Sequence, residues 1–177
     1  MCGITGSLWT NEAQSISREQ LGKMTASLLH RGPDDCGEYF SSHSPSVSKP
    51  AVALGFRRLS IIDLQTGHQP IANEDESIWL IFNGEIYNYL EIKEILNKKY
   101  IDNFNWKGSS DTEVLINAID ILGLNNTLKL IKGMFAFALW DKINKEKIRK
   151  ENLVSYGHDI TDEERSEHNH KIKYPFD

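Results

Sequence analysis

The chain has 177 residues, 40% of them hydrophobic, and a formal net charge of −5. Its length and composition predict one globular domain with a core and a tail, and its acidic balance argues against a nucleic-acid partner. No apolar run approaches the roughly 18 residues that a membrane span requires, and no secretory signal precedes the two cysteines, so we expect a cytoplasmic protein with free thiols and no membrane contact.

The first sixty residues are predicted to form strands and one helix. Residues 2–9 mix β-branched and aromatic residues with glycine, which favours a strand. Ser17 and Gln20 have the spacing of a capping box, so a helix begins there and ends before the Gly32–Pro33 pair. Its expected apolar face consists of Leu21, Met24, Leu28 and Leu29. Three elements follow: a short strand at 38–41, a Ser-rich surface loop at 41–50 and a buried strand that starts at 51.

The second half of the chain carries clearer signals. The stretch "SIWLIFN" at 77–83 predicts a buried strand, and a helix capped by Asn88 follows it. A second helix starts at the capping pair Ser110 and Glu113 and stops at Gly123. The expected apolar faces are Leu90, Ile95 and Leu96 in the first helix, and Val114, Leu115, Ala118, Ile119 and Leu122 in the second.

The last predicted strand is "GMFAFALWD" at 133–141, which is apolar on both alternating faces, as a strand between two layers is. Beyond Lys142 the composition becomes strongly charged and shows no periodicity. We therefore expect a domain over residues 1–142 and a charged tail without a fold of its own over residues 143–177. The tail histidines His158, His168 and His170 lack a Cys or carboxylate array that would complete a site, so no metal is predicted.

Cys2 follows the initiator methionine directly. If Met1 is removed, Cys2 carries a thiol and a free α-amine on the same carbon. An α-amine titrates at about pH 7.7–8, so part of it is neutral at pH 7 and can take the thiol proton. Cys2 is therefore a candidate nucleophile that needs no histidine. The alternative is an ordinary small residue at the start of a strand.

Four other residues are candidates for binding a small ligand. Attack on an amide needs donors for the oxyanion, which the Asn83 side chain and the Gly84 N–H offer, although this dipeptide alone favours a hairpin turn. Arg58 can clamp a carboxylate, or it is an ordinary surface arginine. Asp111 at a helix start can bind an ammonium group, or it only interacts with the helix dipole. Together they match a carboxylate, an ammonium and an amide, as in glutamine.

Seven motifs occur in a recognisable order: "MCGITG", "LLHRGPDD", "FRRLSIIDL", "GHQPI", "FNGEIYN", "SSDTEV" and "GMFAFALWD". This series resembles the glutaminase domain of glutamine-hydrolysing asparagine synthetases, in the class II, N-terminal-nucleophile amidotransferase family. The resemblance covers roughly residues 1–142. It implies an α+β fold, a four-layer αββα sandwich of the N-terminal-nucleophile hydrolase type, and an enzyme that hydrolyses L-glutamine to glutamate and ammonia.

The resemblance also implies roles for individual residues. Cys2 is the expected nucleophile with its own α-amine as base, and Asn83 and Gly84 are the expected oxyanion hole. Arg58 is expected to hold the α-carboxylate of glutamine, while Glu85 and Asp111 receive its amino end. The full set expected to bind glutamine is Arg58, Leu59, Ser60, Ile61, Ile62, Asn83, Gly84, Glu85 and Asp111. No metal or cofactor is expected in this domain, since ATP and Mg belong to the family's synthetase domain.

The sequence departs from the family after residue 142. Relatives continue into a partner strand and an "ARDRxGxKPL"-like segment, which this sequence lacks, so we expect the sandwich to miss its last strands and the strand at 133–141 to keep an unpaired edge. A phosphate-binding glycine loop of the synthetase type is also not found, so the synthetase domain is expected to be absent.

Two hypotheses on function stay open. One is a glutaminase, either a truncated asparagine synthetase or a subunit that hands ammonia to a separate synthetase chain. The other is a non-catalytic remnant or interaction module whose incomplete sheet docks on a partner chain or on a second copy.

Overall fold

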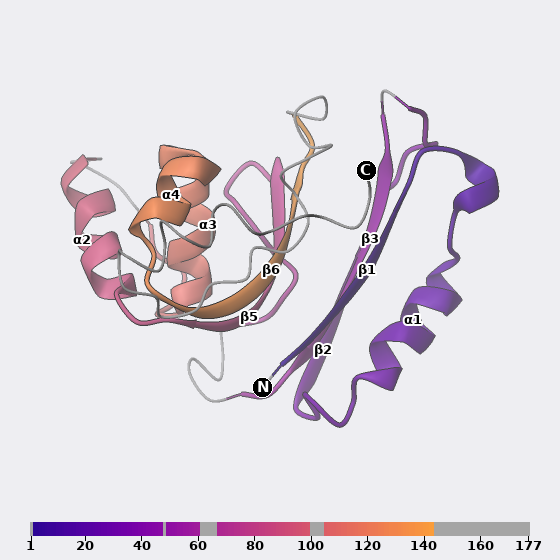
Figure 1. Ribbon diagram of the computed structural model, residues 1–177, viewed down its shortest axis with the longest axis horizontal. Helices are drawn as coiled ribbons and strands as arrows, with labels where there is room; N and C mark the ends of the chain where they lie inside the picture. Colours follow the sequence, from indigo (N-terminus) through magenta and orange to yellow (C-terminus); the bar gives the residue numbers. More distant parts are fainter. Residues whose placement is uncertain (1, 48, 61–66, 100–104, 144–177) are drawn as a thin grey trace, which may run out of the picture.

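Two three-stranded antiparallel sheets pack face to face in the computed structural model, and helices cover the outer face of each sheet (Figure 1). The structure describes residues 2–47, 49–60, 67–99 and 105–143. The order of the layers confirms the predicted α+β fold and four-layer αββα sandwich. The expected lack of further strands and the expected tail concern the sequence after residue 143, which lies outside the described residues.

Sheet A consists of β1 (Gly3–Trp9), β3 (Ala51–Arg58) and β2 (Asp35–Phe40), with β3 in the centre. A short 3-10 helix (Glu12–Gln14) follows β1, and α1 (Arg18–Ser27) covers the outer face of the sheet (Figure 1). Both β1 and β2 run antiparallel to β3, which brings the start of β1 and the start of β2 to the same end of the sheet as the end of β3.

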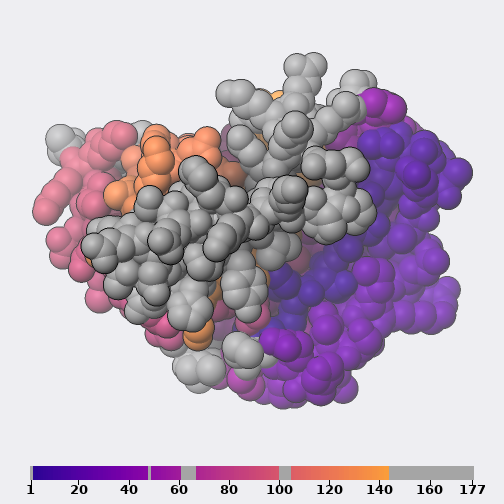
Figure 2. Space-filling model, viewed as in Figure 1, coloured from indigo at the N-terminus to yellow at the C-terminus, as the bar shows by residue number. Residues whose placement is uncertain are grey.

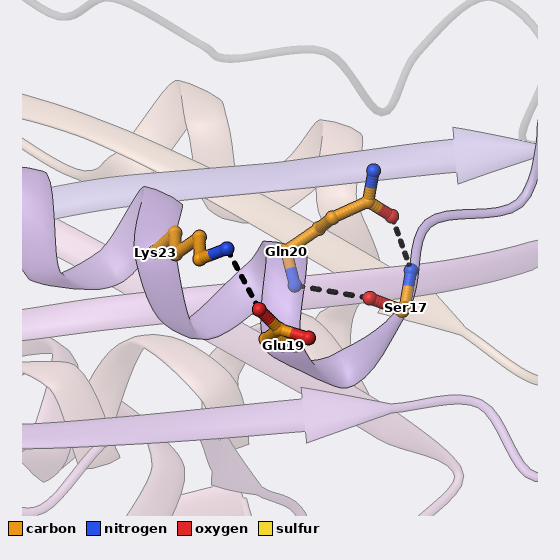
Figure 3. A network of polar contacts seen from close by, with 4 residues as sticks. All are labelled: Ser17, Glu19, Gln20 and Lys23. Atoms are coloured by element: carbon orange, nitrogen blue, oxygen red, sulfur yellow. Dashed lines mark hydrogen bonds and ion pairs between the residues drawn. The ribbon is translucent and has the colours of Figure 1, made fainter.

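The start of α1 is the one that the sequence predicts. Ser17 Oγ accepts the N–H of Gln20 at 3.1 Å, and Gln20 Oε1 accepts the N–H of Ser17 at 2.7 Å, which completes the capping box (Figure 3). Leu21 is fully buried against sheet A, as expected. The prediction for Leu29 is wrong: the helix ends at Ser27, and Leu29 is exposed in the turn that follows.

Sheet B consists of β4 (Ile71–Ala72), β5 (Ile78–Ile86) and β6 (Gly133–Asp141), with β5 in the centre. Its outer face is covered by α2 (Tyr89–Lys99), α3 (Asp111–Leu122) and α4 (Leu124–Leu130). The prediction that β6 is buried on both faces is confirmed, because Phe135 and Phe137 pack towards the helices while Ala138 and Trp140 pack towards sheet A. The sequence did not reveal the short elements β4 and α4.

The expected cap of α3 is confirmed, since Ser110 Oγ accepts the Glu113 N–H at 3.2 Å and the helix stops at Gly123. The reciprocal half of that capping box is not formed. Instead, the Glu113 carboxylate accepts the N–H groups of Lys107 at 2.6 Å and Gly108 at 2.9 Å, and so fixes the segment that leads into the helix.

Helix α2 begins directly after Asn88, as predicted, but the Asn88 side chain serves another purpose. It donates to the Leu130 carbonyl at 2.9 Å and accepts from the Lys132 N–H at 2.8 Å, which ties the start of α2 to the segment before β6. The predicted apolar face is wrong for Leu90 and Ile95, which are exposed. It is confirmed for Leu96, which is buried together with Ile92, a residue that the sequence did not single out.

An apolar cluster lies between the two sheets, and the partly buried Cys2 packs against it. Tyr39 of β2 and Trp79 of β5 stack at 4.3 Å between ring centroids and so join the two sheets. The buried members of the cluster are Val52, Leu54, Phe56, Ile81 and Trp140. Figure 2 shows the same view as a surface, with the layer of α1 and sheet A at the right and helices α2–α4 at the left.

Candidate active site

Cys2 lies immediately before β1 and is half-buried. Its sulfur contacts the backbone of Leu59, the residue that follows β3: the Leu59 N–H donates to Sγ at 3.4 Å, and the thiol donates to the Leu59 carbonyl at 3.7 Å. The Cys2 carbonyl accepts a hydrogen bond from Arg31 Nε at 3.1 Å. The candidate nucleophile is therefore held through its side chain and through its main chain.

Asp34 holds the segment that touches Cys2. Its N–H donates to the Arg58 carbonyl at 3.0 Å, and its Oδ2 accepts the Ser60 N–H at 2.7 Å. Leu59 lies between these two bonds, so the turn before β2 fixes the backbone atoms that contact the Cys2 sulfur. Ile61 and Ile62, which are expected to line the same site, lie outside the described residues.

Arg58 is the last residue of β3 and is only 7% exposed, so the interpretation as an ordinary surface arginine is wrong. Side chains alternate along a strand, which places Arg58 on the same face of β3 as Phe56, the face towards sheet B. Opposite Arg58 on β2 stands Asp35. Burial favours a higher pKa for Asp35, but hydrogen bonds from His68 and from the Cys36 N–H, with the nearby charges of His68 and Arg58, outweigh it and lower the pKa below its ordinary value.

Asn83 and Gly84 lie inside β5, opposite Ala136 and Phe135 of β6. The hairpin-turn interpretation of this dipeptide is therefore wrong. Gly84 has φ of +155°, and a Cβ atom there would collide with the carbonyl of Met134 on the neighbouring strand. Only glycine fits this position, because β6 approaches the backbone so closely.

The edge of β5 that faces away from β6 is closed by side chains. Backbone N–H groups of alternate residues point to the same edge of a strand. Along this edge, Ile78 donates to Asn73 Oδ1 at 2.9 Å, Phe82 donates to Gln69 Oε1 at 2.6 Å and Ile86 donates to Asp111 Oδ2 at 2.9 Å. The same alternation places the Gly84 N–H on this edge, and within the described ranges no acceptor for it is found. Among the described residues, this N–H is therefore a candidate donor to a ligand.

Asp111 is the first residue of α3, and its bond to the Ile86 N–H joins that helix to β5. Burial raises the pKa of Asp111 above its ordinary value, and the charge of the nearby Glu85 adds to the rise, whereas the hydrogen bonds from Ile86 and Thr112 act against it. Glu85 itself is exposed. An ammonium group beside this pair would stabilise the charged form of Asp111.

The predicted residues thus form two groups. One surrounds Cys2 at the end of sheet A, with Arg58, Leu59 and Ser60, and the other follows β5 into α3, with Asn83, Gly84, Glu85 and Asp111. The cluster between the sheets, to which both Cys2 and Ile81 of β5 belong, connects the two groups.

Three further residues belong to these groups and were not found from the sequence: Arg31, Asp34 and Gln69. Their motifs, "LLHRGPDD" and "GHQPI", are visible in the sequence, but the backbone atoms that they contact lie far away along the chain.

Within the described ranges, no group of three or more His, Cys, Asp or Glu side chains is arranged to hold a metal ion. The tail histidines His158, His168 and His170 lie outside those ranges. In the same part of the chain, no helix has both the length and the apolar character needed to cross a membrane.

Curated relatives match most of this chain. The glutamine-hydrolyzing asparagine synthetase 1 of Bacillus subtilis is 43% identical over 144 residues, which cover 80% of this chain and 21% of the relative. The putative glutamine-hydrolyzing asparagine synthetase 2 of Methanocaldococcus jannaschii is 35% identical over 157 residues, which cover 80% of this chain and 28% of the relative. The chain therefore spans between a fifth and a third of the length of these two proteins.

Solved structures share the fold. The glutamine phosphoribosylpyrophosphate amidotransferase of Bacillus subtilis, solved with ADP and GMP, is similar with a TM-score of 0.56 at 22% identity, over 78% of this chain and 35% of that chain. This likeness confirms the predicted N-terminal-nucleophile hydrolase type of sandwich. A family model described as a glutamine amidotransferase domain matches residues 1–151. With this match and the asparagine synthetase relatives, the chain belongs to the glutamine amidotransferase domain family, of which the sequence predicted it to be a member.

Proposed function

We propose that this domain hydrolyses L-glutamine to glutamate and ammonia, with Cys2 as the nucleophile. The observation that carries the proposal is the position of Cys2. Its sulfur is held by the Leu59 backbone at the end of sheet A, beside the cluster that also contains Ile81 of β5, the strand that carries Gly84. A nucleophile and an oxyanion donor thus come from the two facing sheets.

The proposed reaction starts after removal of Met1, when the α-amine of Cys2 takes the proton of its own thiol. The thiolate attacks the side-chain amide carbon of glutamine, and the Asn83 side-chain amide and Gly84 N–H stabilise the oxyanion. The C–N bond then breaks, the amine returns its proton to the leaving nitrogen, and ammonia departs from a thioester on Cys2. Water attacks the thioester, the C–S bond breaks, and glutamate leaves with the thiol restored.

The remaining residues of the site bind the other end of glutamine in this proposal. The Arg58 guanidinium, held on the face of β3 towards sheet B, donates hydrogen bonds to the α-carboxylate, and the backbone of Leu59 and Ser60 lies beside it. Asp111 and Glu85 receive the α-ammonium group. The raised pKa of Asp111 supports this assignment, because burial disfavours the charged carboxylate and a cationic ligand beside it would stabilise that form.

The larger context of the reaction is also a proposal. We place it in the cytoplasm and expect the ammonia to reach a synthetase activity, in which ATP and Mg are used, on a separate subunit or in a larger assembly that includes a second copy of this chain. The expectation that this domain itself uses no metal or cofactor stays a prediction.

The decisive experiment measures glutamate release from glutamine by the purified protein, after mass spectrometry has shown that Met1 is removed. Cys2→Ala is expected to abolish release. Cys36→Ala is the matched control, because Cys36 is the other cysteine and its exposed thiol has no place in the proposed site; it is expected to keep wild-type rates. Release that persists in Cys2→Ala removes the nucleophile assignment. No release from the folded, processed wild-type protein favours the interaction-module hypothesis instead.

A further inference from the structure

Gln69 is a polar side chain that the proposed reaction does not use, although it is only 6% exposed. Its Oε1 accepts the N–H of Phe82 at 2.6 Å. Phe82 directly precedes Asn83 in β5. β4 consists of residues 71 and 72 and pairs with Leu80 and Trp79 of β5. The amide of Gln69 therefore takes the place of a neighbouring strand at Phe82, before β4 begins.

The segment that carries Gln69 is also fixed to the opposite sheet. The Gln69 carbonyl occupies the space where a Cβ of Gly37 would stand, so β2 and this segment are in direct contact. The neighbouring His68 Nδ1 lies 2.8 Å from Asp35 Oδ2, also on β2. Residues 68 and 69 thus contact β2 of sheet A with their main chain and the His68 side chain, and β5 of sheet B with the Gln69 side chain.

We propose that Gln69 is a positioning residue that sets the place of the oxyanion donors Asn83 and Gly84 relative to the sheet that carries Cys2. The Phe82 and Gly84 N–H groups point to the same edge of β5, so a displacement of Phe82 is passed to Gly84 through one intervening residue. The inference deepens the proposed function and rests on it, since an oxyanion donor matters only where an oxyanion forms. Oxyanion stabilisation depends on the donor position within a few tenths of an ångström.

A purely stabilising role is the competing explanation, and the strand offers a matched control for it. Asn73 is 4% exposed and accepts the Ile78 N–H on the same edge of β5 at 2.9 Å. It resembles Gln69 in burial, chemistry and partner, but its bond lies five residues from Asn83. Gln69→Met and Asn73→Leu each remove a buried amide acceptor and keep the size of the side chain.

The first measurement is the steady-state kinetics of glutamine hydrolysis in both variants. Gln69→Met is expected to lower kcat by about 10- to 100-fold with KM for glutamine within threefold of wild type, because the oxyanion forms only in the transition state. Asn73→Leu is expected to leave kcat within threefold, while both variants lose a similar few degrees of melting temperature. Equal losses of kcat in the two variants, or a loss confined to KM, overturn the proposal.

A conservative variant that restores the oxygen acceptor distinguishes a positioning role of Gln69 from a purely stabilising one. Gln69→Glu keeps an oxygen acceptor at the same reach in either protonation state and is expected to recover most of the kcat that Gln69→Met loses. A Gln69→Glu variant as slow as Gln69→Met overturns the role of the Phe82 bond. If Gln69→Met does not fold, Gln69→Asn, which keeps the amide but shortens the reach by one methylene, takes its place in the comparison.

A readout without activity distinguishes this inference from the proposed function. In amide hydrogen exchange and ¹⁵N chemical shifts, Gln69→Met is expected to alter the Phe82 and Gly84 amides, whereas Asn73→Leu alters Ile78 and leaves Gly84 unchanged. If the wild-type protein releases no glutamate, the proposed function fails, and these spectra still decide whether Gln69 positions the strand. An unchanged Gly84 signal in Gln69→Met overturns the inference whatever the wild-type activity is.

Discussion

Around Cys2, a side chain is held by main-chain atoms, whereas along the edge of β5 the main chain is held by side chains. The Cys2 sulfur contacts the N–H and carbonyl of Leu59, both of which survive a change of the Leu59 side chain. The N–H groups of β5 depend instead on the side chains of Asn73, Gln69 and Asp111. Substitutions of these three acceptors therefore disturb the main chain of the β5 half of the site directly, whereas in the Cys2 half substitution of Leu59 leaves the contacts of the Cys2 sulfur in place.

The largest expected effect comes from adding one carbon atom to the β5 half. Gly84→Ala forces a Cβ into the Met134 carbonyl at φ of +155°, so we expect a loss of roughly 2–4 kcal/mol in the free energy of unfolding and a loss of kcat of at least about 100-fold. Urea unfolding and glutamate release measure the two effects.

Gly123→Ala is the control for this substitution. Gly123 also has a positive φ, of +79°, but nothing lies within 4 Å of its Cβ position. Gly123→Ala should therefore lower the free energy of unfolding only by the conformational strain, roughly 1–3 kcal/mol. Equal costs at the two positions would mean that the close approach of β6 to Gly84 does not constrain the strand.

In the Cys2 half, Arg58→Ala should raise KM for glutamine by about 100-fold and leave kcat within a few-fold, because a carboxylate clamp acts in the ground state and the transition state alike. Arg57→Ala is the matched control. Arg57 is the preceding residue of β3, so its side chain points to the opposite face of the strand, towards α1. A similar rise in KM for Arg57→Ala would remove the distinction between the two arginines.

Asp111→Asn is expected to raise KM for glutamine by about tenfold, since a neutral amide binds an ammonium group more weakly than a carboxylate does. Its effect on stability should have the opposite sign. The folded state raises the pKa of Asp111, so the folded protein loses stability as pH rises from the unfolded pKa through the folded pKa. The neutral Asn side chain does not lose stability in this way as pH rises, and its oxygen can still accept the Ile86 N–H.

The measurement for Asp111→Asn is therefore denaturant unfolding at pH 7 beside glutamine kinetics. We expect a free energy of unfolding at least equal to that of the wild-type protein. A variant that is clearly less stable at pH 7, yet binds glutamine normally, would show that Asp111 is a structural link between α3 and β5 and not a ligand group.

The smallest effect is expected at the His68–Asp35 pair, whose side chains are 61% and 37% exposed. The pKa of Asp35 is lowered in the folded state, so its contribution to stability is present above the unfolded pKa and is lost as pH falls through the folded pKa. With His68→Ala, the free energy of unfolding should decrease less on acidification than it does in the wild-type protein. At pH 6 the substitution should lower the free energy of unfolding by less than about 0.5 kcal/mol. His30→Ala, at an exposed histidine that contacts a carbonyl, should leave the pH profile unchanged.

Local signals in the sequence predicted local structure well. The structure contains the predicted caps at Ser17 and Ser110 and the helix end at Gly123. Each of these signals depends only on residues within one helical turn of it. The two-sided burial of β6 follows from seven apolar residues in an unbroken run.

Predictions from the sequence failed where packing between distant segments determines which residues are buried or which conformation the chain adopts. The faces of α2 depend on how the helix lies on sheet B, which spacing alone does not determine, so Leu90 and Ile95 are exposed. Asn83–Gly84 has the composition of a turn, yet it lies in mid-strand because β6 pairs with it from fifty residues away.

The same limit applies to the candidate site. Residue types and motif order drew attention to Cys2, Arg58, Asn83, Gly84 and Asp111. The side chains of Arg31, Asp34 and Gln69 instead contact backbone atoms that lie between 13 and 29 residues away along the chain. A sequence without an alignment gives no measure of such distances.

The contact between Gly37 and the Gln69 carbonyl also limits how this protein can vary. The atom that fills the Cβ position of Gly37 belongs to the main chain, so no choice of side chain at position 69 makes room for a larger residue at position 37. In a library that randomises both positions, glycine should therefore be recovered at 37 with every accepted residue at 69. A lineage that replaces Gly37 first has to change the path of the loop before β4, so this contact between β2 and the loop restricts the mutational paths open to the domain.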